Sequence, residues 1–428
     1  MKYPLQHHAL RSTPLRRLAR PLASCVLALA LPLGCGEDDA DSPSESGFAS
    51  WAASPQDYAE ELPFPGAPAP EAQFFTDQTL RQIVHLSAGG SELRVQLSNL
   101  FGAAPVNIDA AGVAFARGGA GIDASSHVPL TFGGAAQVTL AAGEERWSDF
   151  VPTTLPNGAD LAVSLHFAGM TQVSTLHALG QQTAYLAPGD AVSTATLPDS
   201  DTRQSFYWLS RVDVRGPAAP RVIVAFGDSI TDGFNSTADA NHRYPNYLSE
   251  RLVAQSDSAE YSVVNAGISG NRVLSNVIGP AGLSRFQRDV LSQTGVSDVI
   301  ILLGINDIGF SGFAPEQAAS AAQISAGLEQ LVAAADAAGV RVHLGTLLPF
   351  AGTMAPYYSE AGEAKRQAVN AWIRDNTVAT SIVDFDERME DPARPGTLLP
   401  AYDSGDGLHP NDDGYAAMAE HVAATAFE

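Results

Sequence analysis

The sequence has few cysteines and few lysines. Its 428 residues include two cysteines, Cys25 and Cys35, so the chain after residue 35 cannot form an internal disulfide or a cysteine-based metal site. Lysine occurs only at positions 2 and 365, and the formal net charge is −23. A protein with so large an excess of acidic residues is a poor partner for nucleic acids and for anionic lipid headgroups.

Long hydrophobic runs are also lacking, apart from one near the N-terminus. A basic segment ends at Arg20, an apolar run extends from Leu22 to Leu33, and Gly34-Cys35 follow. The run is too short to span a membrane as a stable helix and is typical of a cleaved export signal. We therefore expect residues 1–35 to be a signal segment and the protein to be exported.

The residues around Cys35, LPLGC, resemble a bacterial lipoprotein signal, in which the cysteine becomes the lipid-modified first residue. Pro32 departs from this pattern, since such signals usually carry Leu there. The alternative is an ordinary secretory signal with an incidental cysteine. The acidic residues 36–49, rich in Ser and Pro, are expected to form a tether. We expect anchoring through Cys35 in the periplasm or at the cell surface, with secretion as the alternative.

Two regions with different hydrophobic patterns follow the tether. In residues 50–216, short alternating or β-branched runs recur between Gly, Pro and Asn, which predicts an all-β sandwich or jelly-roll domain. In residues 217–428, strand-like runs alternate with helical segments, which predicts a parallel sheet with helices on both faces. The expected strands are 221–227, 261–267, 297–304, 341–350 and 381–386, and the clearest expected helices are 314–339, 359–376 and 411–427.

Polar clusters interrupt the pattern of the second region at four places. Ser229 follows the first expected strand, residues 265–271 follow the second, and residues 304–307 follow the third. Asp406 and His409 lie in the loop before the last expected helix. Ligands bind at the carboxyl ends of strands in open α/β sheets, so we expect these clusters to converge. Each cluster alone is also typical of a turn or a helix cap, but the ordered set indicates a catalytic site.

The residue types in these clusters suit nucleophilic catalysis. A serine hydroxyl needs a base to take its proton, and histidine titrates in the appropriate range. Asp406 precedes His409 by three residues, a spacing that lets a turn bring the carboxylate to Nδ1 and leave Nε2 for Ser229. The oxyanion that forms needs hydrogen-bond donors, which the N–H groups of Ser229 and Gly270 and the amide of Asn306 can supply.

The segments GDSITDG, NAGISGN, GIND and DGLH resemble, in this order, the four sequence blocks of the SGNH (GDSL) hydrolase superfamily. The resemblance covers about residues 220–428. It implies a three-layer α/β/α fold of flavodoxin-like type and ester hydrolysis without a metal or cofactor. It also assigns Ser229 as the nucleophile, His409 as the base and Asp406 as the partner of His409.

The same resemblance assigns the oxyanion donors to Ser229, Gly270 and Asn306. Gly267 is the alternative to Gly270, which we prefer because the second block of the family usually ends on the motif glycine. Together with the β domain, the chain is similar to secreted bacterial GDSL esterases that resemble the esterase half of xylan-degrading enzymes. This second resemblance depends on the architecture and on the stretches SNLFG and HALGQQTAYL.

Further polar residues lie beside these blocks. Four of them are candidates for the substrate cleft, Asp228, Asn271, Arg272 and Arg243, and for Arg272 and Arg243 a purely structural role is an equal alternative. Asp228 and Asp232 are expected to fix the serine loop through backbone hydrogen bonds rather than to act as bases. The histidines outside the blocks lack metal-ligand spacing and are expected to be structural, although His177 could also face the catalytic domain.

These observations predict an exported serine esterase that acts through an acyl-enzyme. The leading substrates are short-chain acyl esters, above all acetyl esters, of carbohydrates or small molecules. The alternatives are a lipase, lysophospholipase or thioesterase, an acyltransferase, and a non-catalytic glycan-binding lipoprotein. No pattern in the sequence predicts an apolar acyl tunnel or a lid. We expect no cofactor, no metal, no nucleic-acid partner, a monomer, and membrane contact only through the lipid anchor.

Overall fold

The computed structural model describes residues 47–60, 70–197, 199–217, 219–255 and 260–427. All of them belong to one compact unit, Asp41–Glu428. The predicted signal segment, its Cys35 and most of the predicted tether lie outside the described residues. Within the described ranges, no helix has both the length and the apolar character needed to cross a membrane.

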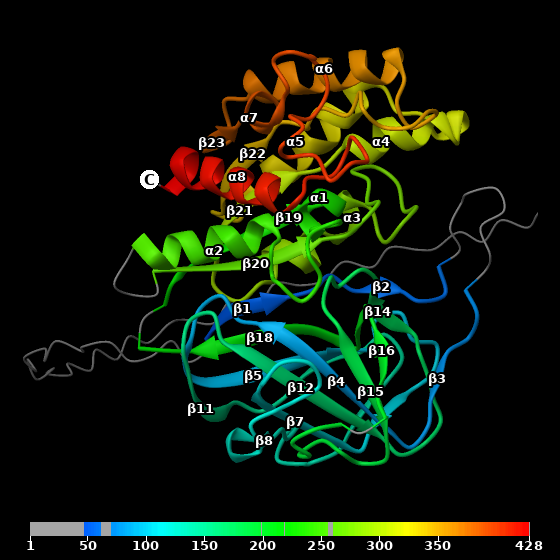
Figure 1. Cartoon of the computed structure of the whole chain (residues 1–428), viewed down its shortest axis with the longest axis vertical. Helices are drawn as coiled ribbons and strands as arrows, with labels where there is room; N and C mark the ends of the chain where they lie inside the picture. Colours follow the sequence, from blue (N-terminus) through cyan, green and yellow to red (C-terminus); the bar gives the residue numbers. More distant parts are fainter. Residues whose placement is uncertain (1–46, 61–69, 198, 218, 256–259, 428) are drawn as a thin grey trace, which may run out of the picture. The chain divides into compact units, whose positions relative to one another are not determined.

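The described part of residues 47–217, the β region, contains two larger antiparallel sheets and three smaller ones (Figure 1). One sheet has the order β1 (Phe48–Ala52), β18 (Leu209–Arg215), β5 (Gly90–Ser98), β10 (Glu145–Trp147), with β11 (Val151–Leu155) also paired to β5. The other has the order β16 (Asp201–Arg203), β15 (Ala184–Pro188), β4 (Gln78–His85), β12 (Asp160–Phe167), β7 (Ala110–Phe115), β8 (Val128–Pro129). The smaller sheets pair β17 (Phe206–Tyr207), β14 (Thr175–His177) and β2 (Gln56–Asp57); β13 (Thr171–Gln172) and β3 (Phe74–Phe75); and β6 (Val106–Ile108) and β9 (Val138–Leu140). A short 3₁₀ turn covers Ala124–Ser126.

Alternating side chains of the two larger sheets form the core of the β region. In β5, Leu93, Val95 and Leu97 are fully buried, as are Leu80 of β4 and Val163 of β12 in the same cluster. Apolar residues two positions apart point to one face of a strand, so this alternation directs one face of each sheet inward. The predicted all-β sandwich is confirmed.

Residues 219–427, the α/β region, contain a parallel sheet of five strands. Its order is β20 (Tyr261–Gly267), β19 (Arg221–Gly227), β21 (Val296–Leu302), β22 (Arg341–Gly345), β23 (Ser381–Val383). Numbered along the chain, this order is 2-1-3-4-5, the flavodoxin-like arrangement with a topological switch point between its first and third strands. The predicted fold class is confirmed.

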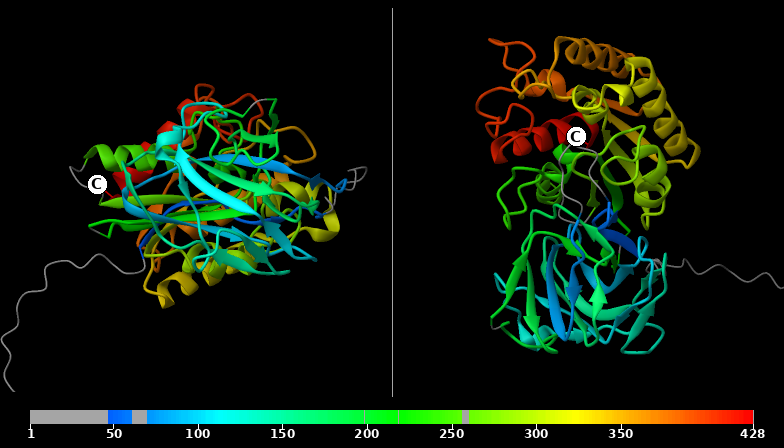
Figure 2. Two further views of the ribbon diagram at one scale, coloured as in Figure 1. Left: turned by 90° about the horizontal axis from the view of Figure 1, so that it is seen from below. Right: turned by 90° about the vertical axis from the view of Figure 1, so that its right-hand side faces the viewer.

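Helices cover both faces of this sheet (Figure 2). Val222, Val224 and Phe226 of β19 share one core cluster with α3 (Gly282–Phe286), α5 (Ala321–Ala337) and α6 (Glu360–Arg374). Ile223 and Ala225 share another with α2 (Tyr244–Gln255), α7 (Phe385–Met389) and α8 (Asp412–Val422). The shorter elements are α1 (Ser229–Asp232), α4 (Ile305–Gly309), the 3₁₀ turns Phe310–Gly312 and Pro315–Gln317, and the π-helical turns Gln287–Leu291 and Ala423–Phe427.

Some predicted boundaries were wrong. The helix expected from residue 314 begins at Ala321, because Ser320 and Gln323 form a capping box that starts it there. The strand expected over 341–350 ends at Gly345, and the helix expected to reach residue 427 becomes a π-helical turn after Val422. Helix α2 was not among the expected helices.

The change from antiparallel to parallel pairing falls between β18 and β19. The two regions are nevertheless in close contact, since β1 packs against β20 and the Ser262 hydroxyl donates to the carbonyl of Ala49 at 2.7 Å. The chain keeps both in one compact unit, and the division into separate domains at residues 216 and 217 stays a prediction.

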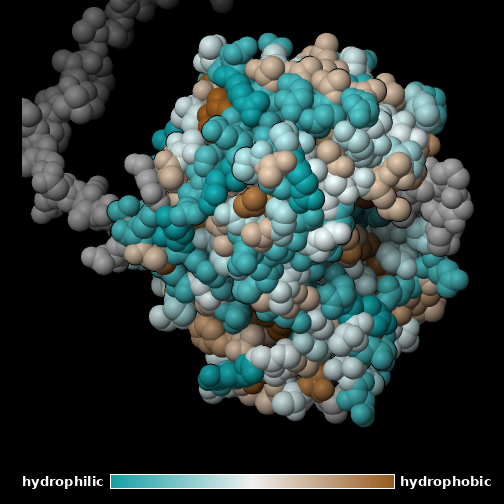
Figure 3. Space-filling model, turned by 45° about the horizontal axis from the view of Figure 1, so that its top comes forward, coloured by the Kyte–Doolittle hydropathy of each residue, from teal (hydrophilic) through white to brown (hydrophobic). Residues whose placement is uncertain are grey.

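Exposed large hydrophobic side chains are scattered over the described surface. Figure 3 shows one face, on which hydrophilic and weakly hydrophobic residues are mixed and strongly hydrophobic ones form small groups. The exposed ones among the described residues are Phe74, Met170, Leu179, Phe313, Met354 and Val378.

Candidate active site

The end of β19 places Ser229 at the carboxyl edge of the sheet. The strand ends at Gly227, where a side chain would not fit, because a Cβ atom there would lie 2.1 Å from Thr231 Oγ1. The Asp228 carboxylate then accepts the N–H of Ile230 at 3.1 Å and caps the short helix α1, whose first residue is Ser229. The serine therefore stands at the tip of a core strand and at the start of a helix.

Ser229 is joined to His409 and Asp406 by hydrogen bonds. Ser229 Oγ lies 2.8 Å from His409 Nε2, and His409 Nδ1 lies 2.7 Å from Asp406 Oδ2. The other Asp406 oxygen accepts the N–H groups of Leu408 and His409 at 2.9 and 2.8 Å. A carboxylate at Nδ1 favours the tautomer that leaves Nε2 as an acceptor for the serine proton. The structure thus brings the three residues together across 180 positions of the chain.

The Asp406 carboxylate is held in its charged form. Burial alone would raise the pKa of Asp406, but hydrogen bonds from the His409 side chain and from the backbone lower it to about 2. Asn235 Nδ2 also donates to Asp406 Oδ2 at 3.0 Å. The carboxylate is therefore ionised at neutral pH and can stabilise an imidazolium at His409.

Gly270 and Asn306 line the same cavity as Ser229. Asn306 Nδ2 donates to the carbonyl of Asn271 at 3.0 Å, and Asn306 Oδ1 accepts the hydroxyl of Tyr357 at 3.0 Å. Tyr357 thereby fixes which end of the amide carries hydrogen, and the amide nitrogen has a second hydrogen besides the one given to Asn271. Tyr357 has no sequence signal of its own.

The two candidate glycine donors differ in their surroundings. The N–H of Gly267 already donates to Asn265 Oδ1 at 2.8 Å, and a Cβ atom at Gly267 would lie 2.3 Å from the backbone nitrogen of Asp232. Gly270 has a φ of +80° and lies at the cavity. A backbone in this left-handed region favours glycine. The geometry supports the choice of Gly270 over Gly267 as the donor.

None of the four residues considered for the cleft is among the lining residues of the cavity, and all four are buried, namely Asp228, Asn271, Arg272 and Arg243. Asn271 Nδ2 donates to the carbonyls of Ile278 and Pro280, both at 2.9 Å, and so shapes the loop that holds Gly270. Arg272 lies over the ring of Phe310 at 5.1 Å. Burial raises the pKa of Asp228 to about 7. Asp228 and Asn271 thus hold the segments that carry Ser229 and Gly270.

A cavity of about 400 Å³ opens beside Ser229, and its walls are mainly apolar. The sequence showed no apolar tunnel because the lining side chains come from separate segments, two of them in the β region. Besides Ser229, Gly270, Asn306, Tyr357 and His409, the lining residues are Gln56, Ala178, Leu179, Phe234, Ser269, Ile278, Phe310 and Leu408. A cavity with such walls has room for an apolar group next to Ser229.

The His, Cys, Asp and Glu side chains of the described residues form no group of three or more that could hold a metal ion.

A parallel α/β sheet with a Ser–His–Asp chain of hydrogen bonds at its carboxyl edge defines the class of α/β serine hydrolases. Residues 225–417 match the model of the GDSL-like lipase/acylhydrolase family. The α/β region therefore is a GDSL-type hydrolase domain, and the protein is a carboxylic ester hydrolase.

Solved structures similar to the chain include an acetylxylan esterase from Geobacillus stearothermophilus, at 23% identity and a TM-score of 0.38, covering 48% of this chain and 93% of the other. Another is an alpha/beta hydrolase from the metagenome of Lake Arreo, Spain, at 24% identity and a TM-score of 0.38, covering 48% and 95%. Among curated proteins, no sequence matches the chain.

Proposed function

We propose that the protein is a serine esterase in which Ser229 is the nucleophile, His409 the general base and Asp406 the partner of His409. The observation that supports this is the unbroken chain of hydrogen bonds, 2.8 Å from Ser229 to His409 and 2.7 Å from His409 to Asp406. Nucleophile, base and orienting acid at these distances are the arrangement that acyl transfer through a serine requires.

The reaction proceeds through an acyl-enzyme. Ser229 Oγ attacks the ester carbonyl carbon while its proton moves to His409 Nε2, and Asp406 stabilises the imidazolium. The oxyanion accepts hydrogen bonds from the N–H groups of Ser229 and Gly270 and from the Asn306 amide. The alcohol leaves with the proton of His409. Water then attacks the acyl group with His409 again as base, and the carboxylic acid leaves.

Short-chain acyl esters of small molecules or carbohydrates, above all acetyl esters, are the first candidate substrates. The apolar cavity beside Ser229 favours a second candidate class, esters that carry a longer apolar group, as in a lipase or lysophospholipase. The net charge of −23 argues against anionic phospholipids within that class.

We also propose that the protein is exported as a monomer and anchored through a lipid on Cys35, with no cofactor and no nucleic-acid partner. The basic segment, the short apolar run and the Gly34-Cys35 pair support export. Fractionation of cells tests the anchor: the native chain should be found with membranes and a Cys35→Ser variant should not. If the native chain and the Cys35→Ser variant are distributed equally between membrane and soluble fractions, the proposed anchor is wrong.

Hydrolysis of p-nitrophenyl esters from acetate to palmitate by the purified full chain tests the function. Ser229→Ala should abolish hydrolysis while leaving the far-UV circular dichroism unchanged. Normal rates in this variant would refute the mechanism, and so would inactivity of the folded native chain on every ester, which would favour an acyltransferase or a glycan-binding protein. Activity confined to short chains would support the first substrate class, and a maximum at longer chains the second.

A further inference from the structure

A short segment of the β region forms part of the wall of the catalytic cavity. Ala178 and Leu179, which directly follow β14, line the cavity with Ser229 and His409. Leu179 is 37% exposed, so its side chain lies at the cavity without being enclosed in the core. The segment His177–Gly180 is thus placed to contact whatever ester reaches Ser229.

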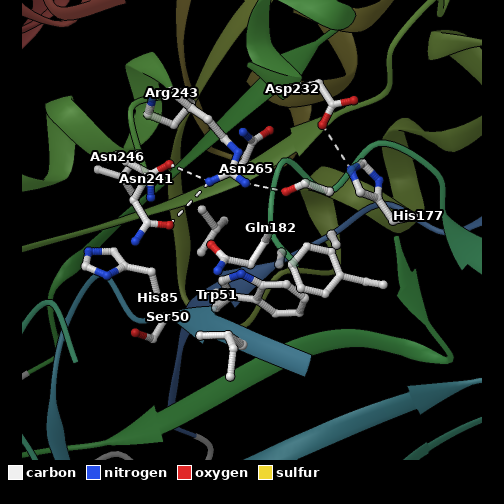
Figure 4. Close-up of a pocket in the computed structure, with 18 residues that line it drawn as sticks. Ser50, Trp51, His85, His177, Gln182, Asp232, Asn241, Arg243, Asn246 and Asn265 are labelled. Carbon is white, nitrogen blue, oxygen red and sulfur yellow. Dashed lines mark hydrogen bonds and ion pairs between the residues drawn. The ribbon is translucent and has the colours of Figure 1, made fainter. Parts of the chain in front are cut away.

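The first end of this segment is fixed by an ion pair with the helix that begins at Ser229. His177 Nε2 lies 2.9 Å from Asp232 Oδ1 (Figure 4). His177 Nδ1 lies 3.1 Å from the carbonyl oxygen of Ser54. Both partners are acceptors, so both ring nitrogens must donate, and a histidine that donates twice is an imidazolium. The His177 and Asp232 side chains are only 6% and 5% exposed.

The second end is fixed by an arginine of the α/β region. The buried Arg243 guanidinium donates a hydrogen bond to the carbonyl of Gly180. Asn246 Oδ1 lies 3.3 Å from Nη1 of the same guanidinium (Figure 4). Between the two ends, the N–H of Ala178 donates to Gln56 Oε1 at 3.0 Å. Ala178 and Leu179 therefore belong to a segment whose two ends, His177 and Gly180, are hydrogen-bonded to the α/β region. Ala178 itself is hydrogen-bonded to Gln56 of the β region.

The same ion pair also reaches the loop that carries the oxyanion donor. Asp232 Oδ2 accepts the N–H and the hydroxyl of Ser269 at 3.0 and 2.6 Å. Ser269 precedes Gly270 and lines the cavity with it. His177, Asp232 and Ser269 thus connect the wall of the cavity to the oxyanion loop through charge-assisted hydrogen bonds, which are stronger than neutral ones.

We propose that the segment His177–Gly180 is the specificity element of this esterase. Leu179 is the specificity-determining residue, which contacts the apolar part of the ester, and His177 is a positioning residue, which holds both Leu179 and the Ser269–Gly270 loop through Asp232. This inference rests on the proposed esterase function and adds to it that the acyl or alcohol group of the substrate is selected by the β region.

Chain-length profiles of two variants test Leu179. The kcat/KM for p-nitrophenyl acetate and hexanoate is measured for the native full chain, Leu179→Ser and Leu179→Met. Leu179→Ser should lower the hexanoate-to-acetate ratio about 10-fold, since loss of apolar contact in a pocket changes discrimination by at least that factor. Leu179→Met, which keeps an apolar side chain of similar volume, should restore the native ratio. Met170→Ser, an exposed apolar residue outside the lining set, is the matched control and should leave the ratio unchanged.

The positioning role is tested with His177→Gln. We expect kcat to fall for both acetate and hexanoate, because Gly270 is the donor for both esters, and the hexanoate-to-acetate ratio of kcat/KM to fall as well, because His177 also holds Leu179. Leu179→Ser should lower that ratio while leaving kcat for acetate near its native value. A purely structural role would lower the midpoint of thermal unfolding without changing kcat well below that midpoint. An unchanged hexanoate-to-acetate ratio in active Leu179→Ser would overturn the inference and leave the esterase function standing. A native chain that hydrolyses neither ester would overturn both.

Discussion

The buried His177–Asp232 pair provides a prediction about stability. Asp232→Asn removes the negative charge and leaves a histidine that is 6% exposed at its side chain beside a neutral amide. Breaking a buried ion pair by changing one partner costs about 3–5 kcal/mol, because the remaining charge has lost its compensation. In the native chain, Asp232 Oδ2 also accepts two hydrogen bonds from Ser269, and the substitution weakens these because the acceptor loses its charge. We predict that Asp232→Asn lowers the free energy of unfolding by about 3–5 kcal/mol.

The size of this loss should depend on pH. Burial alone would lower the pKa of His177, but the charge and hydrogen bond of Asp232 raise it above 6.5. Burial alone would raise the pKa of Asp232, but His177 and Ser269 lower it below 3.8. The contribution of His177 is full below its unfolded pKa and is lost as pH rises through its raised folded value. That of Asp232 is full above its unfolded pKa and is lost as pH falls through its lowered folded value. The loss of unfolding free energy caused by Asp232→Asn is therefore greatest between about pH 4 and 6.5, and it decreases as the pH rises further.

Urea unfolding at pH 5.5 and 8.5, followed by tryptophan fluorescence, measures both effects. Glu420→Gln is the matched control, because it breaks the Arg388–Glu420 pair, whose side chains are 31% and 54% exposed. An exposed pair is worth at most about 1 kcal/mol. If Asp232→Asn costs no more than Glu420→Gln at pH 5.5, or if its cost grows at pH 8.5, the reasoning about the buried pair is wrong.

Two further predictions concern the catalytic groups. Asp406→Asn should lower kcat by about 10⁴-fold, the effect of losing the carboxylate that fixes the histidine tautomer, and an assay of p-nitrophenyl acetate checks it; a loss below 10-fold would remove Asp406 from the mechanism. Asn306→Ala should lower kcat by about 10²–10³-fold with little change in KM, as expected when one oxyanion donor is lost. A rise in KM at constant kcat would instead show that Asn306 binds the ground state.

The convergence of the four polar clusters was predictable because a parallel sheet brings the carboxyl ends of its strands to one edge. Ser229 and Asn306 follow the neighbouring strands β19 and β21, and Gly270 follows β20, so the topology alone places them together. Asp406 and His409 are adjacent through a turn, and their mutual hydrogen bond depends only on local spacing. For these residues, the local sequence pattern and the sheet order were enough to predict that they lie close together.

The walls of the cavity were not predictable in the same way. Leu179, Phe310 and Tyr357 come from unrelated segments, and none of them carries a periodicity or a spacing that refers to Ser229. Trp208 is another example, since its φ of +52° separates β17 from β18 at a residue whose sequence gives no sign of a turn. Both features depend on packing between segments that are distant in the sequence.

His177 connects the residues of the polar clusters to the residues of the cavity wall. From the sequence, a structural role was the main expectation for this histidine, with a position facing the catalytic domain as the alternative. The structure gives it two acceptors, Asp232 and the carbonyl of Ser54. Asp232 is in turn the last residue of the helix that Ser229 begins, so a shift of the β region by an ångström would be transmitted to both this helix and the loop of Gly270. Hydrogen bonds of catalytic groups tolerate little displacement. The β region is therefore better described as a part of the active site than as an appendage to it, and its removal should cost activity even where the α/β region remains folded.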